Sequence, residues 1–101
     1  MATIKDAHIF KDGKPVMRGN ATYENSTLTI KEAKWTDDGA KKNLPFMMKG
    51  GMEVKVKVEG QQMDGHANPL PPNLQKTGTK WQKEMKATKL PNADGEAHFH
   101  G

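Results

Sequence analysis

Apolar and polar residues alternate strictly in one stretch near the middle of the chain. Met52, Val54, Val56 and Val58 are each separated by a charged residue, and glycines stand near both ends of the stretch 50–60. Successive side chains of a strand point to opposite faces, so this pattern places every apolar group on one side. A helix would split the same residues between opposite sides. The pattern therefore predicts a β-strand with one solvated face, which is typical of an antiparallel sheet.

Two pairs of turn residues precede this strand. Asp12-Gly13 separates the short runs 3–10 and 15–18, and Asp-Gly between two such runs predicts a β-hairpin with a type I′ turn. Pro15 cannot donate a ladder hydrogen bond, so the returning strand is expected to lie at an edge or to begin just after it. Asn25-Ser26 predicts a second turn.

The run 27–35 is rich in β-forming residues, but its apolar positions change parity. Leu28 and Ile30 share one face of a strand, whereas Ala33 and Trp35 fall on the other. One extra residue near Lys31-Glu32 would turn the last two back towards the core, so the sequence predicts a β-bulge there.

The residues between this strand and the central one predict no regular element. Residues 36–39 have the composition of a turn or loop, and residues 40–43 are expected to be irregular. The segment 44–48 contains Phe46, Met47 and Met48, and it is expected to be either a buried edge segment or a short exposed apolar patch.

Prolines divide the chain after the central strand. Residues 68–73 contain three prolines, which favour an extended linker. We therefore expect an antiparallel β domain over residues 1–67, a linker over 68–73, and a lysine-rich C-terminal arm over 74–101 that either extends away or packs on the same domain.

Residues 79–90 fit two elements. As a helix, Trp81 and Met85 share a face with Leu74 and Thr88, and Pro91 would end the helix. As a strand, Trp81, Met85 and Ala87 share a face, but Lys83 intrudes on it. The helix is the preferred prediction.

Length and composition set the fold class. A chain of 101 residues with 34% hydrophobic residues can bury one modest core. We predict a mainly β protein, a small antiparallel sandwich or barrel of about five to seven strands, followed by a short C-terminal helix or an extended arm. The expected core residues are Ile4, Ile9, Val16, Leu28, Ile30, Trp35, Phe46, Met52, Val54, Val56 and Val58.

The sequence offers little that would carry catalysis or bind a cofactor. It lacks cysteine, which excludes thiolate chemistry, and its single serine, Ser26, lies in an expected turn. His98 and His100 would point to the same side of an extended segment, about 7 Å apart, but nothing places further ligands beside them. The seven methionines suit a core or a contact surface better than a copper site. We therefore expect no enzyme, cofactor or metal site.

The net charge of +4 belongs to the C-terminal third. Residues 76–89 hold five lysines and one acid, and the rest of the chain is balanced. The leading hypothesis is a non-enzymatic structural or protein-interaction module, a self-associating or partner-bound subunit of a larger assembly such as a virion or an appendage. The alternative is a small β-barrel that binds nucleic acid through Lys55, Lys57 and the C-terminal lysines. The candidate interaction residues are Phe46, Met47, Met48, Lys76, Lys80, Trp81, Lys83, Met85, Lys86 and Lys89.

No secretory signal or membrane-spanning run is visible in the sequence. The N-terminus lacks a basic segment followed by an apolar one, and the longest apolar run is far shorter than the roughly 20 residues that cross a bilayer. We therefore expect synthesis in the cytoplasm and no membrane partner.

Overall fold

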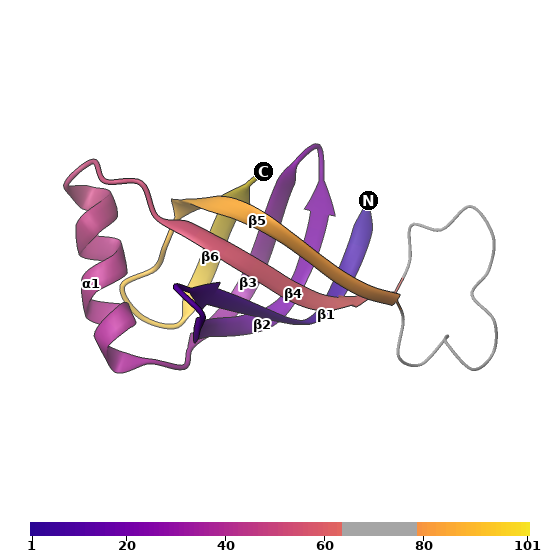
Figure 1. Cartoon of the computed structure of the whole chain (residues 1–101), viewed down its shortest axis with the longest axis horizontal. Helices are drawn as coiled ribbons and strands as arrows, with labels where there is room; N and C mark the ends of the chain where they lie inside the picture. Colours follow the sequence, from indigo (N-terminus) through magenta and orange to yellow (C-terminus); the bar gives the residue numbers. More distant parts are fainter. Residues whose placement is uncertain (64–78) are drawn as a thin grey trace.

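The computed structural model describes residues 1–63 and 79–101, which form six strands and one helix (Figure 1). The strands are β1 (Ala2–Lys11), β2 (Lys14–Glu24), β3 (Thr27–Trp35), β4 (Lys55–Gln62), β5 (Thr79–Lys89) and β6 (Gly95–His100), and the helix is α1 (Asp38–Lys49). They build a closed antiparallel barrel in the order β1-β2-β3-β6-β5-β4, with β4 paired back to β1. The prediction of a small antiparallel β fold is confirmed.

The two hairpin turns form where the sequence predicts them. Asp12 and Gly13 both have positive φ, 52° and 80°, as a type I′ turn requires. Asn25 and Ser26 also have positive φ, 51° and 61°, without a glycine. The local twist of these turns matches that of the flanking strands, so each hairpin enters the barrel with its register set.

Bulges let the strands bend around the core. Between Ile30 and Ala33, β3 has one residue more than either neighbouring strand, which confirms the bulge predicted from the parity change. A second bulge lies at Asp6 in β1, where φ is 52° and the backbone N–H donates to Asn20 Oδ1 at 3.1 Å. Each bulge bends its strand, so that the side chains on both sides of it face the core.

The central strand begins later and ends later than the alternation suggests. β4 starts at Lys55 and runs through Gly60 to Gln62. A Cβ placed on Gly60 would lie 2.5 Å from Ile4 Cγ2, so the missing side chain makes room for the core rather than ending the strand. Val54, Val56 and Val58 are buried as predicted, but Met52 is 59% exposed.

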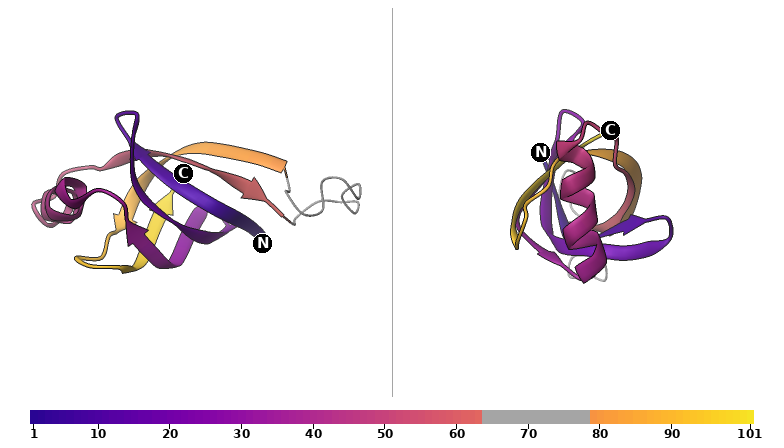
Figure 2. Two further views of the ribbon diagram at one scale, coloured as in Figure 1. Left: turned by 90° about the horizontal axis from the view of Figure 1, so that it is seen from below. Right: turned by 90° about the vertical axis from the view of Figure 1, so that its left-hand side faces the viewer.

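Residues 38–49 form a helix, which corrects the expectation of a loop and irregular chain. The N-cap is Asp37, whose carboxylate accepts the Ala40 N–H at 2.8 Å. Ala40, Leu44, Met47 and Met48 follow at helical spacing and pack against the core, although Pro45 stands within the helix. The helix lies across one end of the barrel (Figure 2), so its apolar stripe covers the core there.

Met52 was predicted to lie in the core, which is wrong, because it belongs to the turn that ends α1. Gly51, with φ of 87°, donates its N–H to Met48 O, and Met52 donates to Met47 O. This is a Schellman motif, in which a left-handed residue ends a helix. Phe46 is 76% exposed on the outer side of the helix, so its assignment to the core was also wrong.

The C-terminal third supplies two strands of the barrel. Residues 79–89 form β5, so the helix preferred for this segment is wrong, and the linker expected at 68–73 lies outside the described residues. Phe99 of β6 is fully buried and is the largest such side chain, although the sequence analysis did not place it in the core. The remaining core residues not predicted were Ala7, Met17, Ala21, Ala33, Leu44, Met85 and Ala97.

Phe99→Ala tests the position of β6 in the core. We expect the substitution to lower the free energy of unfolding in urea by about 3–5 kcal/mol, because it leaves a cavity between packed strands. Phe46→Ala is the matched control and is expected to change it by no more than about 0.5 kcal/mol, since that ring is exposed. Similar losses in the two variants would contradict the arrangement.

The cap of α1 makes stability depend on pH. The Lys14 ammonium, 2.6 Å from the Asp37 carboxylate, and the Ala40 N–H hold the pKa of Asp37 below its usual 3.8. A lowered folded-state pKa stabilises the fold above the unfolded-state value, and this contribution disappears as the pH falls through the folded-state value. Wild type should therefore melt above Asp37→Asn near neutral pH, and the two melting temperatures should converge below pH 3.8. A difference that persists to about pH 2 would contradict the ion pair.

Candidate protein-interaction site

The strand β5 is paired on both sides along only part of its length. β4 pairs with it from Thr79 to Lys86, whereas β6 pairs only with Lys86, Ala87 and Lys89. Among the described residues, no strand pairs with 79–85 on the side away from β4. Figure 1 shows β6 beside the part of β5 nearer α1. On that side the backbone of Gly101 lies against Glu84 and Met85. We call the unpaired side of residues 79–83 the free edge.

The direction of the backbone groups along the free edge follows from one hydrogen bond. Ala87 donates its N–H to Val54 O at 2.9 Å, so the backbone groups of Ala87 face β4. Because these directions alternate along a strand and the register with β4 is unbroken, Lys80, Gln82 and Glu84 turn their N–H and C=O groups away from β4. Gly101 lies against Glu84, so Lys80 and Gln82 are the two positions that present open backbone groups to another strand.

An aromatic contact bridges the gap that β6 leaves beside β5. The ring centroids of Tyr23 in β2 and Trp81 in β5 lie 5.2 Å apart at an interplanar angle of 56°. Tyr23 Oη also donates to the backbone oxygen of Gly101 at 2.9 Å. Side chains thus join β2 to β5 where no main-chain ladder does, and Trp81 is half-buried.

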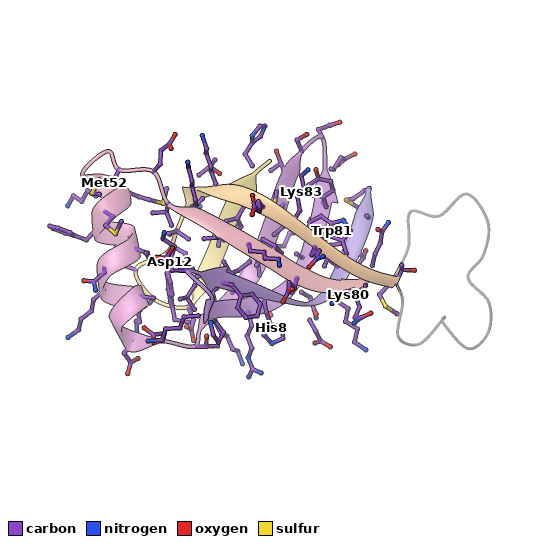
Figure 3. The ribbon with its side chains drawn as sticks, in the orientation of Figure 1. His8, Asp12, Met52, Lys80, Trp81 and Lys83 are labelled. Atoms are coloured by element: carbon purple, nitrogen blue, oxygen red, sulfur yellow. The ribbon has the colours of Figure 1, made fainter. Side chains whose placement is uncertain are left out.

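Lys83 interrupts the apolar side of β5 at the free edge. It pairs with Val58, which is fully buried, so its side chain starts on the inner face of the sheet between Trp81 and Met85. It is nonetheless exposed. Figure 3 shows Lys80, Trp81 and Lys83 along β5, with Met52 at the opposite end beside α1. A charged side chain on the inner face of an edge strand is a known means of limiting unselective edge pairing.

The structure divides the candidate interaction residues into separate groups. Lys80, Lys83, Lys86 and Lys89 are exposed on β5, and Met85 is 3% exposed, so it belongs to the core and is not available to a partner. The candidates on α1 lie at the other end of the barrel. There Phe46 is exposed, whereas Met47 and Met48 are partly buried against the core. Lys76 lies outside the described residues.

A groove of about 770 Å³ lies over β4 and β5, beside the β1–β2 hairpin. Phe10 contributes an aromatic ring to it, and His100 lies at its β6 side. Its formal charges cancel, because the lining holds as many lysines as carboxylates. Lys86 of the groove also pairs with Glu53, outside the lining, at 3.0 Å. Lys86 holds the pKa of Glu53 below its usual 4.5. The lining includes three lysines and three carboxylates: Lys55, Lys57, Lys86, Asp12, Glu59 and Glu84.

The histidines of β6 lie as the sequence predicts. His98 and His100 alternate with the buried Ala97 and Phe99, so both side chains leave the same face of the strand. His98 contacts the Glu96 carboxylate, whose pKa is lowered by this hydrogen bond and by Lys89. Within residues 1–63 and 79–101 no group of three His, Asp or Glu side chains is arranged to hold a metal ion.

Comparison of the chain with models of protein families, with curated proteins and with solved structures gives no match. In the part of the chain that the structure describes, no helix has the length and apolar character needed to cross a membrane.

Sequence reasoning named several side chains of this site but not the free edge. Lys80, Trp81 and Lys83 were selected for charge and aromatic character, whereas Gln82 and Glu84 were not. The sequence did contain one indication of the free edge: as a strand residue, Lys83 falls on the same face as Trp81 and Met85. A lysine on an apolar face suits a strand that has no neighbour on one side.

Proposed function

We propose that this chain is a non-enzymatic protein-interaction module, a subunit of a larger assembly, and that it binds its partner by strand addition at the free edge of β5. The observation that carries the proposal is the unpaired side of residues 79–83, where Lys80 and Gln82 direct their backbone groups outward. An added strand would satisfy these groups, and main-chain hydrogen bonds supply affinity in this mode of recognition.

The character of the surrounding surface supports strand addition over other uses of the barrel. Among the described residues, the charged side chains are not buried, and hydrogen bonds to basic side chains hold the pKa values of Asp37, Glu53 and Glu96 below their usual range. A general acid is usually tuned in the opposite direction by burial. These features favour a surface that binds over one that catalyses.

Nucleic-acid binding has weaker support. Lys55, Lys57 and Lys86 share their groove with three carboxylates, so the groove offers no positive field to a phosphate backbone. Trp81, which could stack on a base, is instead packed against Tyr23. Protein partners fit the exposed backbone of β5 better.

A photo-crosslinking residue at position 80 tests the proposal in cells that make the protein. We expect it to crosslink to an extended segment of a protein, identified by mass spectrometry of the joined peptides. Position 88 is the matched control, because Thr88 is exposed on the same strand where β6 runs alongside. No crosslink from position 80, or equal crosslinking from both positions, would contradict the proposal.

Gln82→Pro provides a second control within the same experiment. Its N–H faces the free edge, so proline there removes no hydrogen bond to β4 and is expected to leave the barrel folded. It should abolish the crosslink from position 80, since it removes a donor from the edge. Lys83→Pro, whose N–H faces β4, should instead destabilise the barrel.

A further inference from the structure

We propose that the free edge takes an extended acidic segment of a protein, with a carboxylate opposite Lys83 and an apolar side chain opposite Trp81. This inference rests on the proposed function and names the chemistry of the partner at the same site. Charge complementarity carries it, because the free edge presents two lysines, one from each face of the sheet.

Lys80 and Lys83 lack the ion pair that Lys86 has further along β5. Lys86 contacts the Glu53 carboxylate at 3.0 Å. In the described part of the chain, no carboxylate forms an ion pair with Lys80 or Lys83. Both lysines are exposed, so their charges are open to a strand added at the free edge.

Lys83 favours a carboxylate over an apolar side chain in the added strand. It pairs with the buried Val58, so its side chain starts from the inner face of the sheet. Glu84 is its neighbour in sequence, but successive side chains of a strand leave opposite faces. An apolar side chain laid over Lys83 would remove water from the ammonium without replacing its hydrogen bonds. A carboxylate there supplies both the opposite charge and an acceptor.

Trp81 sets an apolar position beside the acidic one. Its side chain starts from the same face as Lys83 and is half-buried against Tyr23. The backbone groups of Trp81 and Lys83 face β4, so an added antiparallel strand meets both in non-hydrogen-bonded pairs, where side chains approach most closely. A β-branched or aromatic residue opposite Trp81 would cover the exposed part of its ring.

The end of β6 leaves room for this strand. Lys86 pairs with His100, which places Gly101 beside Met85. The position opposite Lys83 therefore lies beyond the end of β6, where no described residue pairs with β5. The contact needs only residues 79–83 and does not displace the chain terminus.

The sequence pattern of the partner follows from its direction. The strand pairs of the barrel are all antiparallel, and an added strand is expected to continue this arrangement. Read from its N-terminus, it meets Lys83 first, Trp81 third and Lys80 fourth. Lys80 on the outer face suits a second carboxylate. The expected pattern is thus an acidic residue, any residue, an apolar residue and an acidic residue.

Two synthetic peptides test this chemistry on the full chain. One carries Glu-Thr-Val-Glu-Thr between glycines, and the other has lysine in place of both glutamates. Titration to about 5 mM peptide, followed by amide chemical shifts, detects a dissociation constant of about 1 mM. We expect the glutamate peptide to shift the amides of Lys80 and Gln82 and to bind roughly tenfold or more tightly than the lysine peptide. Equal binding of the two peptides, or no shift with the glutamate peptide, overturns the inference.

Lys83→Glu and Lys89→Glu form a matched pair of variants. They change the net charge equally, but Lys89 lies where β5 pairs with β6. Lys83→Glu should weaken binding of the glutamate peptide by roughly tenfold and make the lysine peptide the tighter ligand. Lys89→Glu should change either affinity by less than about threefold, because exposed charges at a distance are screened. Equal effects of the two variants would show attraction to net charge alone and would overturn the assignment to Lys83.

Salt gives a readout that needs no variant. The preference of wild type for the glutamate peptide should largely disappear at about 1 M salt, where the Debye length is about 3 Å. A preference that persists unchanged would contradict charge pairing at the exposed lysines.

The outcomes separate this inference from the proposed function. If position 80 crosslinks to a segment without acidic residues and the two peptides bind equally, the proposed function stands with a partner of other chemistry. If position 80 crosslinks to no protein and the glutamate peptide shifts no amide of the free edge, both are wrong.

Discussion

The difference in length between β5 and β6 is the constraint on which the rest of the structure depends. The backbone of Gly101 lies against Glu84, and β5 continues from there to Thr79 without a described neighbour on that side. Among the described residues, main-chain hydrogen bonds therefore do not complete the ladder around this part of the barrel. The contact of Tyr23 with Trp81 holds the two sides together instead.

The other distinctive features of β5 follow from the same constraint. Lys83 can occupy an inward position because no strand covers its side chain, whereas Met85, beside Gly101, is buried. The barrel is thus completed by main-chain pairing near α1 and by aromatic side chains at the other end. The proposed strand addition rests on this unpaired edge beside a half-buried tryptophan.

Local sequence patterns predicted the elements whose conformation is decided by residues close together in the chain. Alternation located β4, turn residues located both hairpins, and the parity change in β3 located its bulge. The helix was not predicted, although the sequence has a capping residue, Asp37, followed by apolar residues at helical spacing. Gly39 and Pro45 within the segment are poor helix formers and favoured a loop. For β5, a tryptophan and a methionine four residues apart suit a helix as well as a strand, and only pairing with β4 decides between them.

The candidate site could be predicted only in part, because it depends on strand order. The lysines and Trp81 were visible in the sequence, but a free edge exists only relative to the strands beside it. Phe99 shows the same limit. Its flanking histidines resembled a solvated tail, yet β6 is the strand that joins β3 to β5 and carries the largest fully buried side chain.

Amide hydrogen exchange in a dilute sample tests the free edge most directly. The account predicts alternation along β5, with fast exchange at Lys80 and Gln82 and slow exchange at Trp81, Lys83 and Met85, whose N–H groups face β4. Equal protection of all five amides in the dilute sample would contradict it, because the edge would then already be paired.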